Sequence, residues 1–128
     1  MFTASPQSIA RWSVAFVFLY HGLVPKLLLM HPSEIALISA TPTMGLDPRL
    51  LVQGAGFAEV ALAALLVFQW QSRWPLYVAA VALGVLILMT VVFVPSILVE
   101  AFNPLSLTVT TLALVWVALY DPAIAQSE

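Results

Sequence analysis

Two oppositely charged residues, Lys26 and Glu59, stand within long apolar stretches of this sequence. A charged side chain at the centre of a membrane costs about 3 kcal/mol on insertion scales, so such residues usually face the interior of a helix bundle and pair there. We therefore predict that both side chains point into one cavity, at salt-bridge distance or through one bridging water. His21 and Asn103 complete the predicted polar cluster, which we interpret as a candidate ligand-binding site.

Each of these residues also has a purely structural interpretation. The charged pair could only pin two helices together. His21 could bond to a backbone carbonyl that Pro25 leaves free, and we favour this over a role as a ligand-binding residue. Asn103 could only cap the helix that begins at Pro104. His21 and His31 are separated by a proline and have no carboxylate close in sequence, so we predict no metal site.

The composition indicates a membrane protein. Of 128 residues, 62% are hydrophobic and 8% are charged, and the mean hydropathy is +1.06. A water-soluble domain carries about 25% charged residues. The net charge of −2 and the lack of a basic cluster argue against nucleic acid as a partner. Without cysteine the chain has no disulfide or thiol redox couple. Residues 1–8 lack a signal-peptide pattern, so we expect the first apolar stretch to persist in the mature protein.

Four apolar stretches divide a single domain, residues 1–128. They cover about residues 9–30, 50–70, 76–94 and 104–120, and a stretch of about 20 apolar residues is long enough to span a bilayer. The predicted fold class is thus all-α: a four-transmembrane-helix bundle with a short interfacial or re-entrant helix in the first loop. Four spans put both termini on one side, which we assign to the cytoplasm because the last loop holds only Glu100.

Local signals place the elements around the cluster. Pro25 should bend or end the first helix. The loop from His31 to Arg49 contains Ile35, Leu37, Ile38 and Leu46, and we expect these side chains to fold it over one mouth of the bundle. Gly54 and Ala58 form a small-xxx-small pair that should let a neighbouring helix approach closely. The hydroxyls of Ser106, Thr108, Thr110 and Thr111 are expected to bond back to their own helix.

Several motifs together resemble the DoxX-like family of small four-helix membrane proteins. They are Arg11-Trp12, Gly22-Leu23-Val24-Pro25-Lys26, Glu59 and Phe102-Asn103-Pro104-Leu105, and the resemblance runs from about Arg11 to Tyr120. It implies a four-span bundle in a bacterial inner membrane. The family pattern carries over to Gly22, Pro25, Lys26, Glu59, Asn103 and Pro104. The residue type at the position of His21 varies in the family.

The resemblance also suggests two functions. Relatives include a subunit of a quinone-reducing thiosulfate oxidoreductase and a membrane partner of superoxide dismutase and a sulfurtransferase. This implies a membrane subunit that binds a quinone-like or other small amphipathic ligand beside Lys26 and Glu59. Its expected partners are the lipid bilayer and a soluble oxidoreductase or another membrane subunit, with an oligomer left open. The alternative is a non-catalytic scaffold or assembly subunit whose charged pair is only structural.

Overall fold

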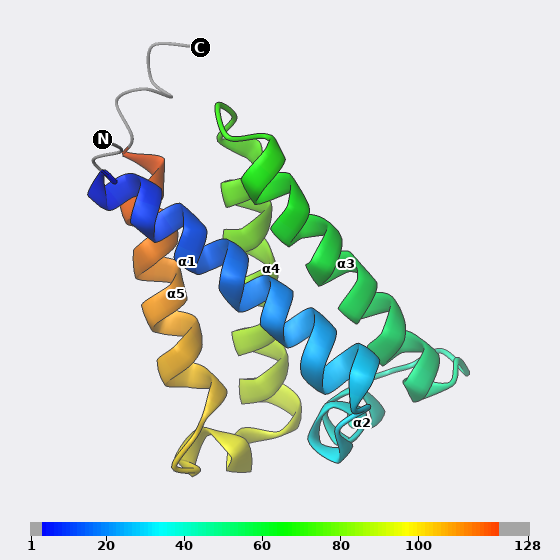
Figure 1. Ribbon diagram of the computed structural model, residues 1–128. Helices are drawn as coiled ribbons and strands as arrows, with labels where there is room; N and C mark the ends of the chain where they lie inside the picture. The colour runs from blue at the N-terminus through cyan, green and yellow to red at the C-terminus, as the bar shows by residue number, and fades with distance from the viewer. Residues whose placement is uncertain (1–3, 121–128) are drawn as a thin grey trace.

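The structure, a computed structural model, describes residues 4–120, and the regular secondary structure in this part is all helical (Figure 1). The N-terminal segment without a signal-peptide pattern, residues 1–8, is described only from residue 4 onward. No strand occurs between residues 4 and 120. The elements are α1 (Pro6–His21), η1 (Gly22–Leu28), α2 (Pro32–Ser39), α3 (Pro48–Phe68), α4 (Trp74–Phe93), η2 (Pro95–Val99) and α5 (Pro104–Leu119). The helices cover all four apolar stretches.

The same capping device starts three of the long helices. A small polar residue precedes a proline, and its side-chain oxygen accepts a hydrogen bond from a backbone N–H of the first turn. Ser5 does this for α1 at 3.1 Å, Asp47 for α3 at 2.9 Å and Asn103 for α5 at 2.9 Å. Proline at the first helical position lacks an N–H that would otherwise have no partner. These caps fix where the apolar segments begin.

Pro25 neither ends the first helix nor bends it sharply. The helix widens instead into the π-helical segment η1, which continues to Leu28. Proline cannot donate to the carbonyl four residues earlier, and the wider turn lets later amides reach carbonyls further back. Leu29 donates to the carbonyl of Val24 at 3.0 Å, and His31 donates to that of Pro25 at 2.7 Å. Only after this does the chain turn, by 92°, into α2.

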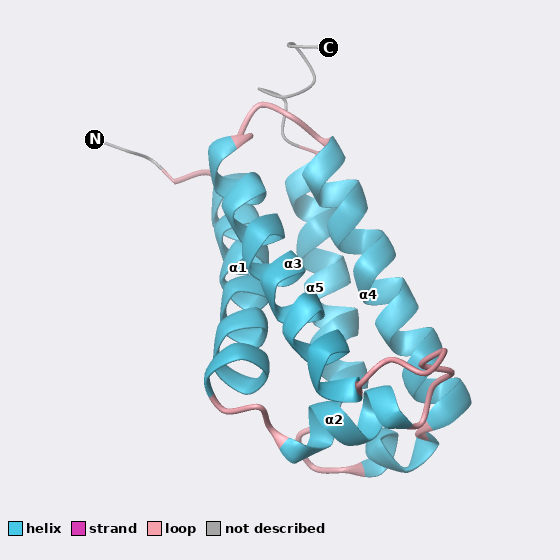
Figure 2. Cartoon of the chain, turned by 90° about the vertical axis from the view of Figure 1, so that its right-hand side faces the viewer, coloured by secondary structure: helices cyan, strands magenta, loops and turns pink. Residues whose placement is uncertain are grey.

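Helices α1, α3, α4 and α5 run between the same two ends of the molecule (Figures 1 and 2). The start of α1 and the end of α5 lie at one end, and α2 lies at the other. Helix α1 packs against α3 and α5, while α4 packs against α5 and α3. Apolar side chains fill the interior, among them Val14, Phe18, Leu66, Leu76 and Val115.

The outer surface of the bundle is apolar as well. Phe16, Phe57, Val81 and Trp116 are each more than half exposed, as expected for side chains that face lipid. By length and composition α3 and α4 can each cross a membrane, and the path from α1 through α2 qualifies only if the bent pair is one span. Helix α5, with 16 residues, is shorter. Two or three helices therefore meet the criterion, and the predicted count of four spans goes beyond it.

Segment η1 and helix α3 approach closely at Gly22 and Gly56. A Cβ atom on Gly22 would lie 2.7 Å from the carbonyl oxygen of Gly56, and one on Gly56 would lie 2.9 Å from that of Gly22. The prediction that Gly54 and Ala58 provide the close approach is wrong for this bundle. Both are exposed, and a Cβ atom on Gly54 would meet nothing within 4 Å. The glycine that allows the close approach is Gly56, which lies on a different face of α3 from Gly54 and Ala58.

Arg11 is buried inside the bundle, although a cation beside a tryptophan at the start of an apolar segment is typical of an anchor at the membrane surface. It is 2% exposed. Its guanidinium donates to the carbonyls of Leu66 at 2.7 Å, Gln69 at 2.7 Å and Ser72 at 3.0 Å. The last carbonyls of a helix have no intrahelical partner and carry partial negative charge. Arg11 thus caps the carboxyl end of α3 and ties it to α1.

Candidate functional site

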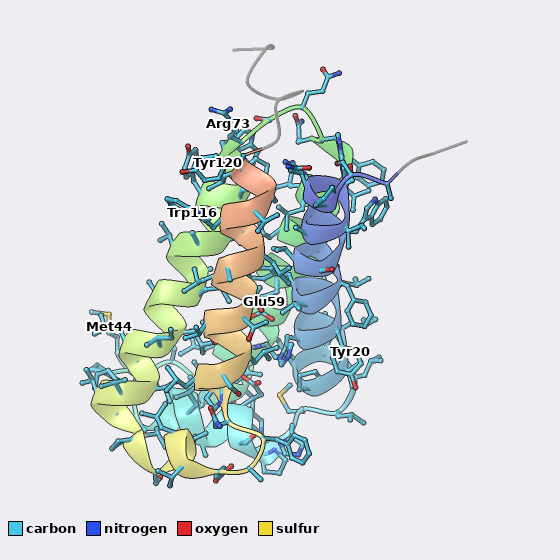
Figure 3. All side chains as sticks on the ribbon, turned by 90° about the vertical axis from the view of Figure 1, so that its left-hand side faces the viewer. Tyr20, Met44, Glu59, Arg73, Trp116 and Tyr120 are labelled. Carbon is cyan, nitrogen blue, oxygen red and sulfur yellow. The ribbon has the colours of Figure 1, made fainter. Side chains whose placement is uncertain are left out.

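Lys26 and Glu59 form the predicted ion pair. The Nζ atom of Lys26 donates to Oε2 of Glu59 at 3.0 Å. The ammonium side chain is 10% exposed and the carboxylate side chain 25%. Figure 3 shows Glu59 within the bundle, away from the outer surface that carries Tyr20. The two charges therefore satisfy each other inside the fold, as their cost in an apolar surrounding requires.

The glycine contact explains how Lys26 reaches Glu59 from the end of its helix. Gly56 precedes Glu59 by one helical turn on α3, and a Cβ atom on Gly56 would lie 2.9 Å from Cβ of Lys26. The backbones of η1 and α3 are thus too close for any side chain larger than glycine at position 56, beside Cβ of Lys26. The ammonium needs no bend at Pro25 to meet the carboxylate.

A second carboxylate, Glu34, completes the charged cluster. Its Oε2 atom lies 3.5 Å from Nζ of Lys26, and its side chain is 20% exposed. By its position Glu34 is only an acidic residue in the first turn of a short helix, where acids are common. Nothing in its spacing from Lys26 indicated the contact, because the 92° turn before α2 brings it there. The cluster is one ammonium between two carboxylates.

Helix α2 covers one mouth of the bundle, as predicted. It packs against α3, and Glu34 and Leu37 line the interior cavity described below. Ile35 and Ile38 are partly buried. The expectation for Leu46 is wrong, because this side chain is 56% exposed. The apolar side of α2 and the contact of Glu34 with Lys26 hold the segment in place.

The charged cluster lines a cavity of about 490 Å³ in the half of the bundle near α2. Sites for small organic ligands commonly have volumes of about 300–1,000 Å³ and apolar walls with a few polar groups. Most of the wall here is apolar and comes from α1, α4, η2 and α5: Phe18, Leu83, Leu86, Val94, Ile97 and Leu107. The exposed lining residues Ser33, Ala36, Glu100 and Phe102 mark its mouth, between α2 and the turn before α5.

The other two predicted site residues line the same cavity but not in the same way. His21 is partly buried, and its ring lies edge-on to Tyr20, with 6.1 Å between ring centroids. Within residues 4–120 no hydrogen bond forms to its ring, so the predicted bond to a freed carbonyl is absent there. Asn103 caps α5, and its Nδ2 donates to the carbonyl of Glu100 at 3.1 Å. Glu34, rather than Asn103, is the third member of the ion-pair cluster.

The hydroxyls at the start of α5 bond back to their own helix, as expected. Thr108 donates to the carbonyl of Pro104 at 2.6 Å and Thr111 to that of Leu107 at 2.8 Å. Ser106 and Thr110 do the same at 3.3 Å and 2.8 Å. No group of three metal-binding side chains comes together in the described part of the chain.

Comparison with known proteins identifies one family. The model of the DoxX-like family matches residues 15–116, about four fifths of the chain. The matched range contains His21, Lys26, Glu34, Glu59 and Asn103. No curated protein and no solved structure matches this chain.

Proposed function

This chain belongs to the DoxX-like family, and on that premise we propose that it is a membrane protein that binds a small amphipathic, quinone-like molecule in its interior cavity. The observation that carries the proposal is the combination of a mostly apolar cavity with a charged cluster at one end. An amphipathic molecule has the same two-part character. Its apolar body would lie along α4 and α5, with its polar head beside Lys26.

Each polar residue has a role in this proposal. Lys26 binds the head group by donating a hydrogen bond to a carbonyl or other acceptor. Glu59 holds Lys26 in place and exchanges a proton with the head group. His21 faces the cavity with its ring unbonded in the described structure, so it is available to the ligand. Asn103 shapes the mouth by fixing the start of α5.

The proposed setting is a bacterial inner membrane crossed four times, by α1 with η1, α3, α4 and α5. A soluble oxidoreductase or another membrane subunit would exchange electrons with the bound molecule, consistent with the redox relatives that the family resemblance implies. Both termini would then lie on one side of the membrane, the cytoplasmic side by our assignment. The four long helices run between the same two ends of the molecule and have apolar outer surfaces, which supports four crossings.

Purification in a mild detergent tests the proposal. The protein should carry an amphipathic molecule that organic extraction and mass spectrometry identify, and a short-chain quinone should bind saturably to the emptied protein. Lys26→Met should weaken binding, whereas Arg49→Gln, a cation lost from outside the cavity, should not. Protein without bound material and without saturable quinone binding would contradict the proposal.

The alternative function is a non-catalytic scaffold, which the tight packing of the cluster against the Gly22–Gly56 contact favours. Here the ion pair only pins α3 to η1. Removing one partner of a buried pair typically costs about 3–5 kcal/mol, while an apolar replacement of both can be neutral. The double variant Lys26→Met/Glu59→Leu should therefore keep both stability and function if the protein is a scaffold. If the cluster binds a ligand, it should keep stability and lose function.

A further inference from the structure

Two buried hydroxyl groups on the cavity wall can act only as hydrogen-bond acceptors toward a ligand. Thr90 and Thr108 are each 1% exposed and line the cavity. Thr90 donates its hydroxyl proton to the carbonyl of Leu86 at 2.8 Å, and Thr108 donates to that of Pro104 at 2.6 Å. A hydroxyl whose proton is used in this way offers only lone pairs to a ligand.

The charged cluster adds further acceptors. Glu59 and Glu34 both contact Lys26 through Oε2, at 3.0 Å and 3.5 Å. An ionised carboxylate accepts at both oxygens, and in the described part of the chain no hydrogen bond reaches Oε1 of either residue. Lys26 has three N–H donors, of which one is bonded to Glu59, and the carboxylate of Glu34 lies 3.5 Å from the same ammonium. The two Oε1 atoms of the cluster remain as acceptors for a ligand.

The net charge of the cluster also favours a ligand that donates a hydrogen bond over an anionic ligand. One ammonium faces two carboxylates within a mostly apolar cavity, so the cluster does not favour a further negative charge. A ligand with a carboxylate or phosphate head would meet this repulsion. A ligand with an O–H group would find a free carboxylate oxygen, and hydrogen bonds to charged acceptors are the stronger kind.

We propose that the cavity binds its ligand through a head group that donates a hydrogen bond to Glu59. For a quinone-like ligand this is the hydroquinone form, in preference to the quinone form, which only accepts. Glu34 contributes a second negative charge beside Lys26, which further disfavours an anionic head group. The inference rests on the proposed function, since it names the form of the ligand that this cavity takes.

Three probes on one skeleton test the inference: a decyl-substituted hydroquinone, the corresponding benzoquinone and the dimethyl ether of the hydroquinone. They are titrated anaerobically against the full chain in nanodiscs of zwitterionic lipid, and lipid-only nanodiscs correct for partition into the bilayer. We expect the hydroquinone to bind about tenfold more tightly than the dimethyl ether, because one hydrogen bond to a charged group is lost. The benzoquinone should also bind more weakly than the hydroquinone.

Two failures are distinguishable. Equal or tighter binding of the benzoquinone or the ether overturns the inference and leaves the ligand-binding function standing. If no probe binds above the lipid-only level, both are overturned.

A variant pair locates the acceptor. Glu59→Gln keeps the side-chain size and leaves Glu34 to pair with Lys26, but replaces a carboxylate oxygen by a donating amide. The preference for hydroquinone over its ether should fall severalfold in this variant. Asp47→Asn removes an exposed carboxylate outside the cavity and keeps the cap of α3, so it should leave the preference unchanged. An unchanged preference in folded Glu59→Gln overturns the assignment, and if that variant does not fold, the wild-type comparison still decides the inference.

Discussion

The Gly22–Gly56 contact makes a quantitative prediction about stability through the variants Gly56→Ala and Gly54→Ala. Both glycines lie inside α3, so each substitution gains about 1 kcal/mol of helix propensity. A Cβ atom at Gly56 would lie 2.9 Å from the carbonyl oxygen of Gly22, from Cγ of Leu27 and from Cβ of Lys26. Overpacking of this kind costs about 1–3 kcal/mol. A Cβ atom at Gly54 would meet nothing within 4 Å.

The difference between the two variants isolates the packing cost, because the propensity gain cancels. We expect Gly56→Ala to be less stable than Gly54→Ala by about 1–3 kcal/mol. The assay is reversible unfolding in mixed micelles by titration with sodium dodecyl sulfate, followed by circular dichroism. Equal unfolding free energies for the two variants would refute the close approach of η1 and α3, and with it our explanation of how Lys26 reaches Glu59.

Three further predictions concern the charged groups and helix α2, which covers one mouth of the bundle. In Lys26→Met, Glu59 loses its counter-ion and should take up a proton, so infrared spectroscopy should show a protonated carboxyl C=O band that is absent from wild type; an unchanged Glu59 signal would argue against the shared site. Arg11→Gln should lower the unfolding free energy by about 2 kcal/mol or more, because three carbonyls of the α3 terminus lose a charged donor; Arg49→Gln, at an exposed position, should change it by less than about 0.5 kcal/mol. Amide hydrogens in α2 should exchange more slowly than in a free peptide and faster in Glu34→Gln, and free-peptide rates in wild type would contradict its packing over the cavity.

The sequence was sufficient to predict the Lys26–Glu59 pair because a physical cost forces it. Two opposite charges in apolar helices have few stable arrangements. Where the two helices are antiparallel neighbours, the remaining arrangement is an ion pair inside the bundle. The start of α5 was predictable as well, because Asn103 and Pro104 form a typical pair of N-cap and first helical residue. The role of Glu34 was not predictable. Its contact depends on the direction of the chain after η1, which no local pattern encodes.

The rotation of each helix was also beyond the sequence. Helix α3 is apolar on most sides, so periodicity does not distinguish the face of Gly54 from that of Gly56. A strongly amphipathic helix would have made the choice clear. Arg11 presents the same difficulty, because a cation near the start of an apolar segment is typical of an interface anchor. The guanidinium of Arg11 is buried because it binds carbonyls at the end of α3, which is far away in sequence.

The central claim is that the cavity beside Lys26 and Glu59 holds an amphipathic ligand. Photo-crosslinking in native membranes tests it most directly, with a quinone probe that carries a diazirine on its alkyl tail. We predict that peptide mapping finds the label on the cavity wall, at Leu83 and Leu86, and that excess unlabelled quinone abolishes it. Label confined to the outer surface, at Phe57 and Val81, or label that excess quinone does not displace, would contradict the claim.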